Sequence, residues 1–105
     1  MKFDLVAHIE RQRAFSEEVF GPGERYEGIA DHIREELDEL AESPLDLEEW
    51  VDVALLALDG AWRAGHSPEE IAKAIAMKQS KNELRKWPDW RTQDRRKSIK
   101  HIKAV

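Results

Sequence analysis

The chain has 105 residues, of which 41% are hydrophobic, and this length supports one folded domain around one core. It contains no cysteine, which excludes disulfide bonds and thiolate metal ligands and favours a reducing compartment, so we expect a cytoplasmic protein. The net charge of −5 is unevenly divided, because residues 1–77 carry 7 Lys and Arg against 19 Asp and Glu, whereas residues 78–105 carry 10 against 3.

Four segments have the periodicity of amphipathic helices, and we expect an all-α fold. The first runs from about residue 4 to 19, and the second from about residue 25 to 42. The third begins near Asp46 and ends at Gly65, and because apolar residues surround most of its circumference, we expect it to be the central buried helix. Its apolar run over residues 53–58 is far shorter than a membrane span, so no membrane partner is expected.

The fourth helix has a clear start and a clear stop. Ser67 is a typical N-cap, Pro68 suits the first helical position, and Glu70 completes a capping box. Pro88 prevents the helix from continuing into the polar residues that follow.

The organisation of the whole chain follows from these four helices. Short connections over residues 43–45 and 65–67 favour antiparallel neighbours, so we expect a four-helix bundle within a single domain, residues 1–105. The basic residues 89–105 are expected to form a C-terminal tail, with a short helix over residues 95–103.

Two acidic pairs with the same spacing stand out. Glu36 and Glu39 lie on the second helix, and Glu49 and Asp52 lie on the third. Residues three apart share one helix face, with Cβ atoms roughly 5–6 Å apart, so each pair presents its carboxylates side by side. In an antiparallel hairpin the four groups converge, and they then need cations, donors or a metal ion. The same stripe of the third helix continues to Asp59, beyond these residues.

Each pair also has a simpler interpretation. The first pair could be a solvated helix face balanced by Arg34. Glu49 could be the capping-box partner of Asp46. Asp52 has no such explanation, because it interrupts an apolar run, and its pairing with Glu49 favours a metal site. Histidine ligation is disfavoured, because the histidines lack paired metal-ligand spacing.

The pattern Glu35-Glu36-x-x-Glu39 followed by Glu49-x-x-Asp52 resembles the metal motif of the MazG-like, all-α nucleoside triphosphate pyrophosphohydrolases. Longer stretches together resemble the dATP/dGTP diphosphohydrolase branch, whose phage members are called MazZ: HIERQRAFSEEVFGPG, DHIREELDEL, DLEEWVDVALLALDGAWRAGHSPEEI and KQSKNELRKWPDWR. These stretches cover most of residues 8–91.

The resemblance implies hydrolysis of a purine deoxynucleoside triphosphate to the monophosphate and pyrophosphate, by a homodimer or homotetramer that uses Mg²⁺ or, as a substitute, Mn²⁺. It implies that Glu36, Glu39, Glu49 and Asp52 are the metal ligands and that Glu35 orients or deprotonates the attacking water. The chemistry agrees with this assignment, because carboxylate oxygens suit Mg²⁺ and a bound metal ion neutralises charge on phosphoryl oxygens.

The triphosphate needs more positive charge, because four carboxylates already cancel the charge of two Mg²⁺ ions. Lys78, Asn82 and Arg85 share a face of the fourth helix and Lys81 flanks it, so they match the phosphate-contacting residues that the resemblance implies. The simpler interpretation of these cations is a solvated helix face.

Base recognition is assigned to the first helix. The segment around His8, Gln12, Phe15 and Phe20 offers the aromatic rings and hydrogen-bonding groups that a purine pocket needs.

Two function classes remain open. The first is the Mg²⁺-dependent enzyme, for which dUTP, dCTP or a damaged nucleotide is an alternative substrate. The second is a helical module that binds nucleic acid through the basic tail. Inward carboxylates would only destabilise such a module, so the sequence favours the enzyme, and we expect no nucleic-acid partner.

Overall fold

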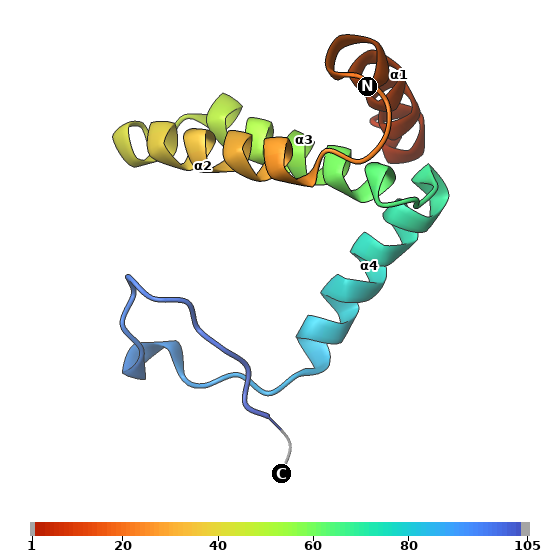
Figure 1. Cartoon of the computed structure of the whole chain (residues 1–105). Coiled ribbons are helices and arrows are strands. Elements are labelled where there is room, and N and C mark those ends of the chain that lie inside the picture. The colour runs from red at the N-terminus through yellow and green to blue at the C-terminus, as the bar shows by residue number, and fades with distance from the viewer. Residues whose placement is uncertain (1, 104–105) are drawn as a thin grey trace. The chain divides into compact units, whose positions relative to one another are not determined.

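The computed structural model describes residues 2–103 and consists of helices joined by short connections (Figure 1). The elements in chain order are α1 (Leu5–Phe20), α2 (Tyr26–Glu42), α3 (Leu47–Arg63), α4 (Pro68–Leu84) and a short 3₁₀ helix, η1 (Trp90–Thr92). No strand occurs among the described residues, so the all-α class is confirmed and the four helices are consistent with a four-helix bundle. In the same range no helix has the length and apolar character that crossing a bilayer requires.

The contacts between residues divide the chain into two compact units, with the boundary between Lys73 and Ala74. In the first unit, α2 and α3 pack together as a hairpin and α1 packs against α3. The second unit contains the rest of α4 and the segment after it. Within that unit the backbone N–H of Ile102 donates to the carbonyl oxygen of Lys86 at 2.8 Å, which ties the end of the described chain back to the end of α4.

The helix ends follow the local signals of the sequence. Asp4 and Asp46 cap α1 and α3, each with its side-chain oxygen accepting a backbone N–H of the first turn. Ser67 and Glu70 form the expected capping box, with reciprocal hydrogen bonds of 3.1 and 3.0 Å. Hydrogen bonds from Ser67 hold the pKa of Glu70 below its ordinary value. Gly65 follows α3 with a φ of +104°, a left-handed conformation that favours glycine.

The core of the first unit lies where three helices meet. Ile9 of α1, Trp62 of α3 and Ile71 of α4 form its buried centre, and Leu5 and Leu58 pack against them. Burying such side chains stabilises a fold by about 1.5–3 kcal/mol each. The first turn of α4 therefore belongs to the core of the first unit, although most of α4 belongs to the second.

The third helix is not buried along its whole length, which corrects the expectation of a central buried helix. Asp59 and Trp62 in its second half are buried, whereas Trp50 and Val51 in its first half are 54% and 44% exposed. The reason is that α2 covers only one side of α3, while the bonds and core contacts of α1 involve Leu55 and later residues of α3.

The expected helix over residues 95–103 is also wrong. Asp89 instead caps η1, and the side chain of Asp94 accepts the backbone N–H of Arg96 at 2.9 Å. The turn at Asp94 does not continue as a helix, because the backbone N–H of Ile102, which a helix would pair with residue 98, instead donates to the carbonyl oxygen of Lys86. Hydrogen bonds from Arg96 also lower the pKa of Asp94.

A buried arginine fastens the α1–α2 connection to α3. The side chain of Arg63 is 2% exposed, and its Nε lies 3.2 Å from Oδ2 of Asp59. Its Nη1 donates to the carbonyl oxygens of Gly21 and Gly23 at 2.9 and 2.7 Å, and its Nη2 donates to Oγ of Ser16 at 2.9 Å. One guanidinium therefore fixes the end of α1 and the loop after it.

Replacing this arginine should destabilise the first unit strongly. Arg63→Met leaves the Asp59 carboxylate and the loop carbonyls without their donor, so we expect a loss of about 3–5 kcal/mol in the free energy of unfolding by urea. The control is Arg13→Met, which removes an exposed ion pair with Glu17 and a stack on Trp62 and should lower that free energy by about 1 kcal/mol. Equal losses in the two variants would contradict the proposed role of Arg63.

A candidate metal centre and the pocket beside it

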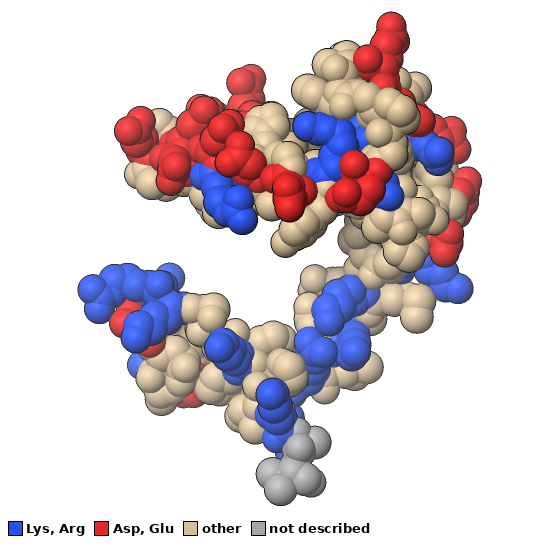
Figure 2. All heavy atoms as spheres, in the orientation of Figure 1, with Lys and Arg blue, Asp and Glu red and all other residues tan. Residues whose placement is uncertain are grey.

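Three carboxylates meet across the α2–α3 hairpin. Glu36 of α2 and Glu49 and Asp52 of α3 each offer one oxygen, and these three atoms lie within 4.8 Å of one another. Glu36 lies near the end of α2 and Glu49 lies in the first turn of α3, so the tight turn between the helices brings them together. Figure 2 shows acidic side chains gathered over these two helices.

Some carboxylate oxygens of the cluster have neither a hydrogen-bond donor nor a basic side chain beside them. Oε2 of Glu36 and Oε2 of Glu49 are buried, and neither accepts a hydrogen bond from an N–H or hydroxyl group of the described chain. Oε1 of Glu36 lies 3.4 Å from Nε2 of His32, and no Lys or Arg of the described chain forms an ion pair with Glu36, Glu49 or Asp52. Buried carboxylate oxygens without a partner are destabilising, and an all-oxygen ligand set is the kind that hard divalent cations prefer. The residues present therefore fit a magnesium-type ion.

The crowding is reflected in the pKa of Glu49, which rises from 4.5 to about 7. The largest cause is a side-chain hydrogen bond with Glu36, followed by one with Glu39, burial and charge repulsion. Two carboxylates can share a hydrogen bond only if one of them is protonated. Without a cation the cluster therefore retains a proton near neutral pH, and a divalent ion would replace it.

The predicted ligands are thus largely brought together. Glu36, Glu49 and Asp52 form the cluster, while the exposed Glu39 is close enough to affect the pKa of Glu49 but is not among the three. Glu35 is exposed on α2, one residue before Glu36.

The simpler interpretations do not account for Glu36 and Glu49, whereas Glu39 is exposed, as a solvated residue would be. Asp46 accepts the N–H of Glu48, and its own N–H donates to the carbonyl oxygen of Ser43, so Glu49 has no part in a capping box. Among the described residues Arg34 forms no ion pair with the acids.

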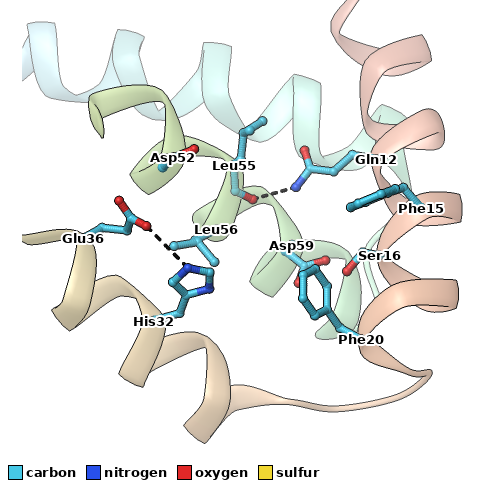
Figure 3. A pocket seen from close by; sticks show the side chains of 10 residues that line it. All are labelled: Gln12, Phe15, Ser16, Phe20, His32, Glu36, Asp52, Leu55, Leu56 and Asp59. Atoms are coloured by element: carbon cyan, nitrogen blue, oxygen red, sulfur yellow. Dashed lines mark hydrogen bonds and ion pairs between the residues drawn. The ribbon is translucent and has the colours of Figure 1, made fainter. Parts of the chain in front are cut away.

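A pocket of about 320 Å³ extends from the cluster toward α1 (Figure 3). It is bounded by α1, α2 and α3 of the first unit, and its lining combines aromatic, aliphatic and acidic side chains: Gln12, Phe15, Ser16, Phe20, His32, Glu36, Asp52, Leu55, Leu56 and Asp59. This volume falls within the range of small-molecule sites.

The residues expected to recognise a base lie in this pocket or hold it in shape. The pocket lining includes Gln12, Phe15 and Phe20. The two phenylalanine rings pack edge to face, with their centroids 6.4 Å apart. Nε2 of Gln12 donates to the carbonyl oxygen of Leu55 at 2.7 Å, and its Oε1 lies 3.0 Å from Nε2 of His8. His8 therefore does not line the pocket but fixes the amide of Gln12, for which it must carry its proton on Nε2.

The expected phosphate-binding residues lie in the second unit, whereas the carboxylates lie in the first. Lys78, Lys81 and Asn82 are on α4, and Arg85 follows its last turn. Nη1 of Arg85 donates to Oδ1 of Asn82 at 2.9 Å, and Nε1 of Trp87 donates to the carbonyl oxygen of Asn82 at 2.7 Å. Asn82 thereby positions the guanidinium of Arg85. Lysines and arginines gather over this unit in Figure 2.

Sequence reasoning missed half of the residues that line the pocket, including two with titratable side chains, His32 and Asp59. His32 contacts Glu36 four residues later, a spacing at which helical side chains meet, so this contact had a signal in the sequence. Asp59 was placed on the acidic stripe without a role. Its partners, among them Arg63 and the loop that Arg63 binds, become apparent only in the fold.

One of three comparisons with known proteins found a match. A family model described as dATP/dGTP pyrophosphohydrolase matches residues 8–105, a range that includes all the cluster and pocket residues. The resemblance to the dATP/dGTP branch, drawn from the longer stretches of sequence, is thereby confirmed. A search of curated proteins and a search of solved structures each found no match.

The raised pKa of Glu49 predicts how the metal-free protein responds to pH. Below pH 4.5 the group is protonated in both the folded and the unfolded chain, so it has no differential effect. Between pH 4.5 and about 7 the unfolded chain loses this proton first, so stability falls as pH rises. In EDTA, the melting temperature of Glu49→Gln relative to the wild type should therefore rise across this window and then level off.

The neighbouring Glu48→Gln is the matched control, because it removes the same charge from an exposed position of the same helical turn. It should not reproduce this pH dependence. A difference between Glu49→Gln and the wild type that is constant from pH 4 to pH 8 would contradict the crowded cluster.

Proposed function

Because the chain belongs to the dATP/dGTP pyrophosphohydrolase family, we propose that it converts dATP or dGTP to the monophosphate and pyrophosphate with Mg²⁺. It is an enzyme of the hydrolase class that acts on nucleoside triphosphates. The main observation in favour of Mg²⁺-dependent hydrolysis of dATP or dGTP is the group of unpartnered carboxylate oxygens at one side of a pocket with aromatic residues.

In this proposal Glu36, Glu49 and Asp52 bind the metal ion and Glu39 completes the ligand set. The ion pair with His32 holds Oε1 of Glu36 and leaves Oε2 for the metal. When bound, Mg²⁺ supplies charge neutralisation on the phosphoryl oxygens and favours ionisation of the attacking water. Mn²⁺ shares the preference for oxygen ligands and should substitute.

Glu35 is proposed to orient or deprotonate the attacking water. It precedes a proposed ligand on α2, and its side chain is exposed, so solvent reaches it without a rearrangement. A carboxylate in this position can hold a water by hydrogen bonding and accept its proton as the phosphoanhydride bond breaks.

The second unit is proposed to bind the phosphates. Lys78 and Lys81 provide exposed ammonium groups, and Arg85 provides a planar guanidinium that Asn82 already positions. Positive charge of this kind is required, because the carboxylates and the metal ions leave the charge of the triphosphate unbalanced.

The pocket is proposed to bind the purine, with the rings of Phe15 and Phe20 available for stacking and the fixed amide of Gln12 for hydrogen bonding. The family match favours a purine over dUTP, dCTP or a damaged nucleotide. A module that binds nucleic acid through its basic tail would not need the acid cluster of Glu36, Glu49 and Asp52.

A cytoplasmic homodimer or homotetramer is the proposed working form. The exposed apolar side chains of Leu47, Trp50 and Val51 on α3 support association, because a second copy could bury them. Light scattering of the wild-type protein that found only monomers would contradict this assembly.

Removing a proposed ligand should abolish turnover and leave the fold intact. Glu36→Gln and Asp52→Asn each keep the side-chain shape but withdraw a negative oxygen from the metal, so we expect kcat/KM for dATP to fall by about a hundredfold or more. Helicity measured by circular dichroism should stay near that of the wild type.

The control is Asp38→Asn, an exposed carboxylate on α2 outside the cluster, which should keep wild-type turnover. Retained Mg²⁺-dependent release of pyrophosphate by either ligand variant would refute the ligand assignment.

Removing the proposed phosphate contacts should weaken substrate binding. Lys78→Ala and Arg85→Ala each delete a cation, so we expect KM for the triphosphate to rise about tenfold, since charged hydrogen bonds contribute about 1.5–3 kcal/mol. Lys73→Ala, an exposed lysine nearer the start of α4, is the control. Unchanged kinetics in both test variants would remove the phosphate role.

A further inference from the structure

Asp59 is a buried acid that the proposed metal site does not use. The residue is 6% exposed, and one of its oxygens, Oδ2, pairs with Nε of Arg63 at 3.2 Å. The other, Oδ1, is buried and has no hydrogen-bond partner. A buried carboxylate oxygen without a donor is destabilising, and such atoms in folded proteins call for an explanation.

The position of Asp59 in the pocket suggests what the donor is. Asp59 follows Asp52 by seven residues on α3, a rise of roughly 10 Å along the helix. Figure 3 shows Asp59 beside the α1 end of the pocket, near the labelled Ser16 and Phe20, with Glu36 and Asp52 toward the other end. A nucleotide with its phosphates at the metal cluster would extend its base toward this far end.

The chemistry of Asp59 limits what it can recognise. An ionised carboxylate only accepts hydrogen bonds, and the pairing of Oδ2 with Arg63 fixes its orientation. The group that meets Oδ1 must therefore be a donor. On the Watson–Crick edge of a purine, adenine presents its 6-amino group, and guanine presents N1–H at the adjacent position.

We propose that Oδ1 of Asp59 accepts a hydrogen bond from the purine base, from the 6-amino group of adenine or from N1–H of guanine. Asp59 would thereby select bases that carry a donor on this part of the Watson–Crick edge. The inference rests on the proposed function, because it places the phosphates at the carboxylate cluster. It accounts for the use of both purines by one acceptor, since a small shift of the base exchanges one donor for the other. The rings of Phe15 and Phe20 line the same pocket and are 60% and 48% exposed, so neither is enclosed by the rest of the chain.

The first test changes the ligand and leaves the protein untouched. Wild-type hydrolysis of dATP is compared with that of the deoxynucleoside triphosphate of unsubstituted purine, which has hydrogen in place of the 6-amino group. We expect kcat/KM for the analogue to be lower by about tenfold to a hundredfold, because the buried oxygen then remains without a donor. Equal values for the two nucleotides would overturn the inference.

The second test changes the protein. In Asp59→Asn the amide oxygen should turn to Arg63, which can only donate, and present its NH₂ group to the base. The ratio of kcat/KM for dATP to that for the analogue should then fall toward one. This ratio is measured within a single protein, so a loss of folded enzyme does not affect it.

The control for this ratio is Asp38→Asn, which should keep the wild-type value. A wild-type ratio in Asp59→Asn would assign the discrimination to another residue and overturn the inference. The outcomes also separate the two proposals. Wild-type protein that hydrolyses neither dATP nor dGTP would overturn the proposed function and this inference with it, whereas hydrolysis without discrimination would overturn this inference alone.

Discussion

The proposed metal site follows from the crowding of carboxylates where α2 and α3 face each other. Glu36 and Glu49 bury oxygens that have no donor, and the pKa of Glu49 rises to about 7 in response. A hairpin of ordinary surface helices has no reason to keep such a cluster, because like charges in close contact oppose the packing that brings them together. A divalent cation would remove this conflict, and the chain belongs to a family that acts on dATP and dGTP.

The other contacts of the first unit form the pocket beside the carboxylate cluster. Gln12 bonds to the backbone of α3 at Leu55, and Arg63 bonds to the end of α1 and the loop after it. These polar contacts set α1 against α3 while the apolar core lies elsewhere, around Ile9 and Trp62. The gap that remains beside the carboxylates is the pocket, so the contacts that stabilise the fold also form the proposed nucleotide site.

The sequence predicted the local features of the fold and missed the long-range ones. The caps at Asp4 and Ser67 and the four helices were predicted because each depends on neighbours within one or two helical turns. The exposure of Trp50 was not predicted, because it depends on how much of α3 the other helices cover. The helix expected in the tail is absent because the backbone N–H of Ile102 bonds to the carbonyl oxygen of Lys86, far outside the reach of a helical turn. At the site, helical spacing anticipated that Glu36, Glu49 and Asp52 lie close together, whereas Glu39 lies outside their cluster. The unpaired oxygen of Asp59 depends on residues some forty positions away that engage its partner Arg63.

The most direct test of the central claim is anomalous diffraction from crystals of the protein soaked in Mn²⁺. We expect a strong anomalous peak among the carboxylates of Glu36, Glu49 and Asp52, at the ligand distances of about 2.0–2.2 Å typical of small divalent ions with carboxylate ligands. A map at saturating Mn²⁺ with no peak there, and with these side chains directed into solvent on separate surfaces, would contradict the account.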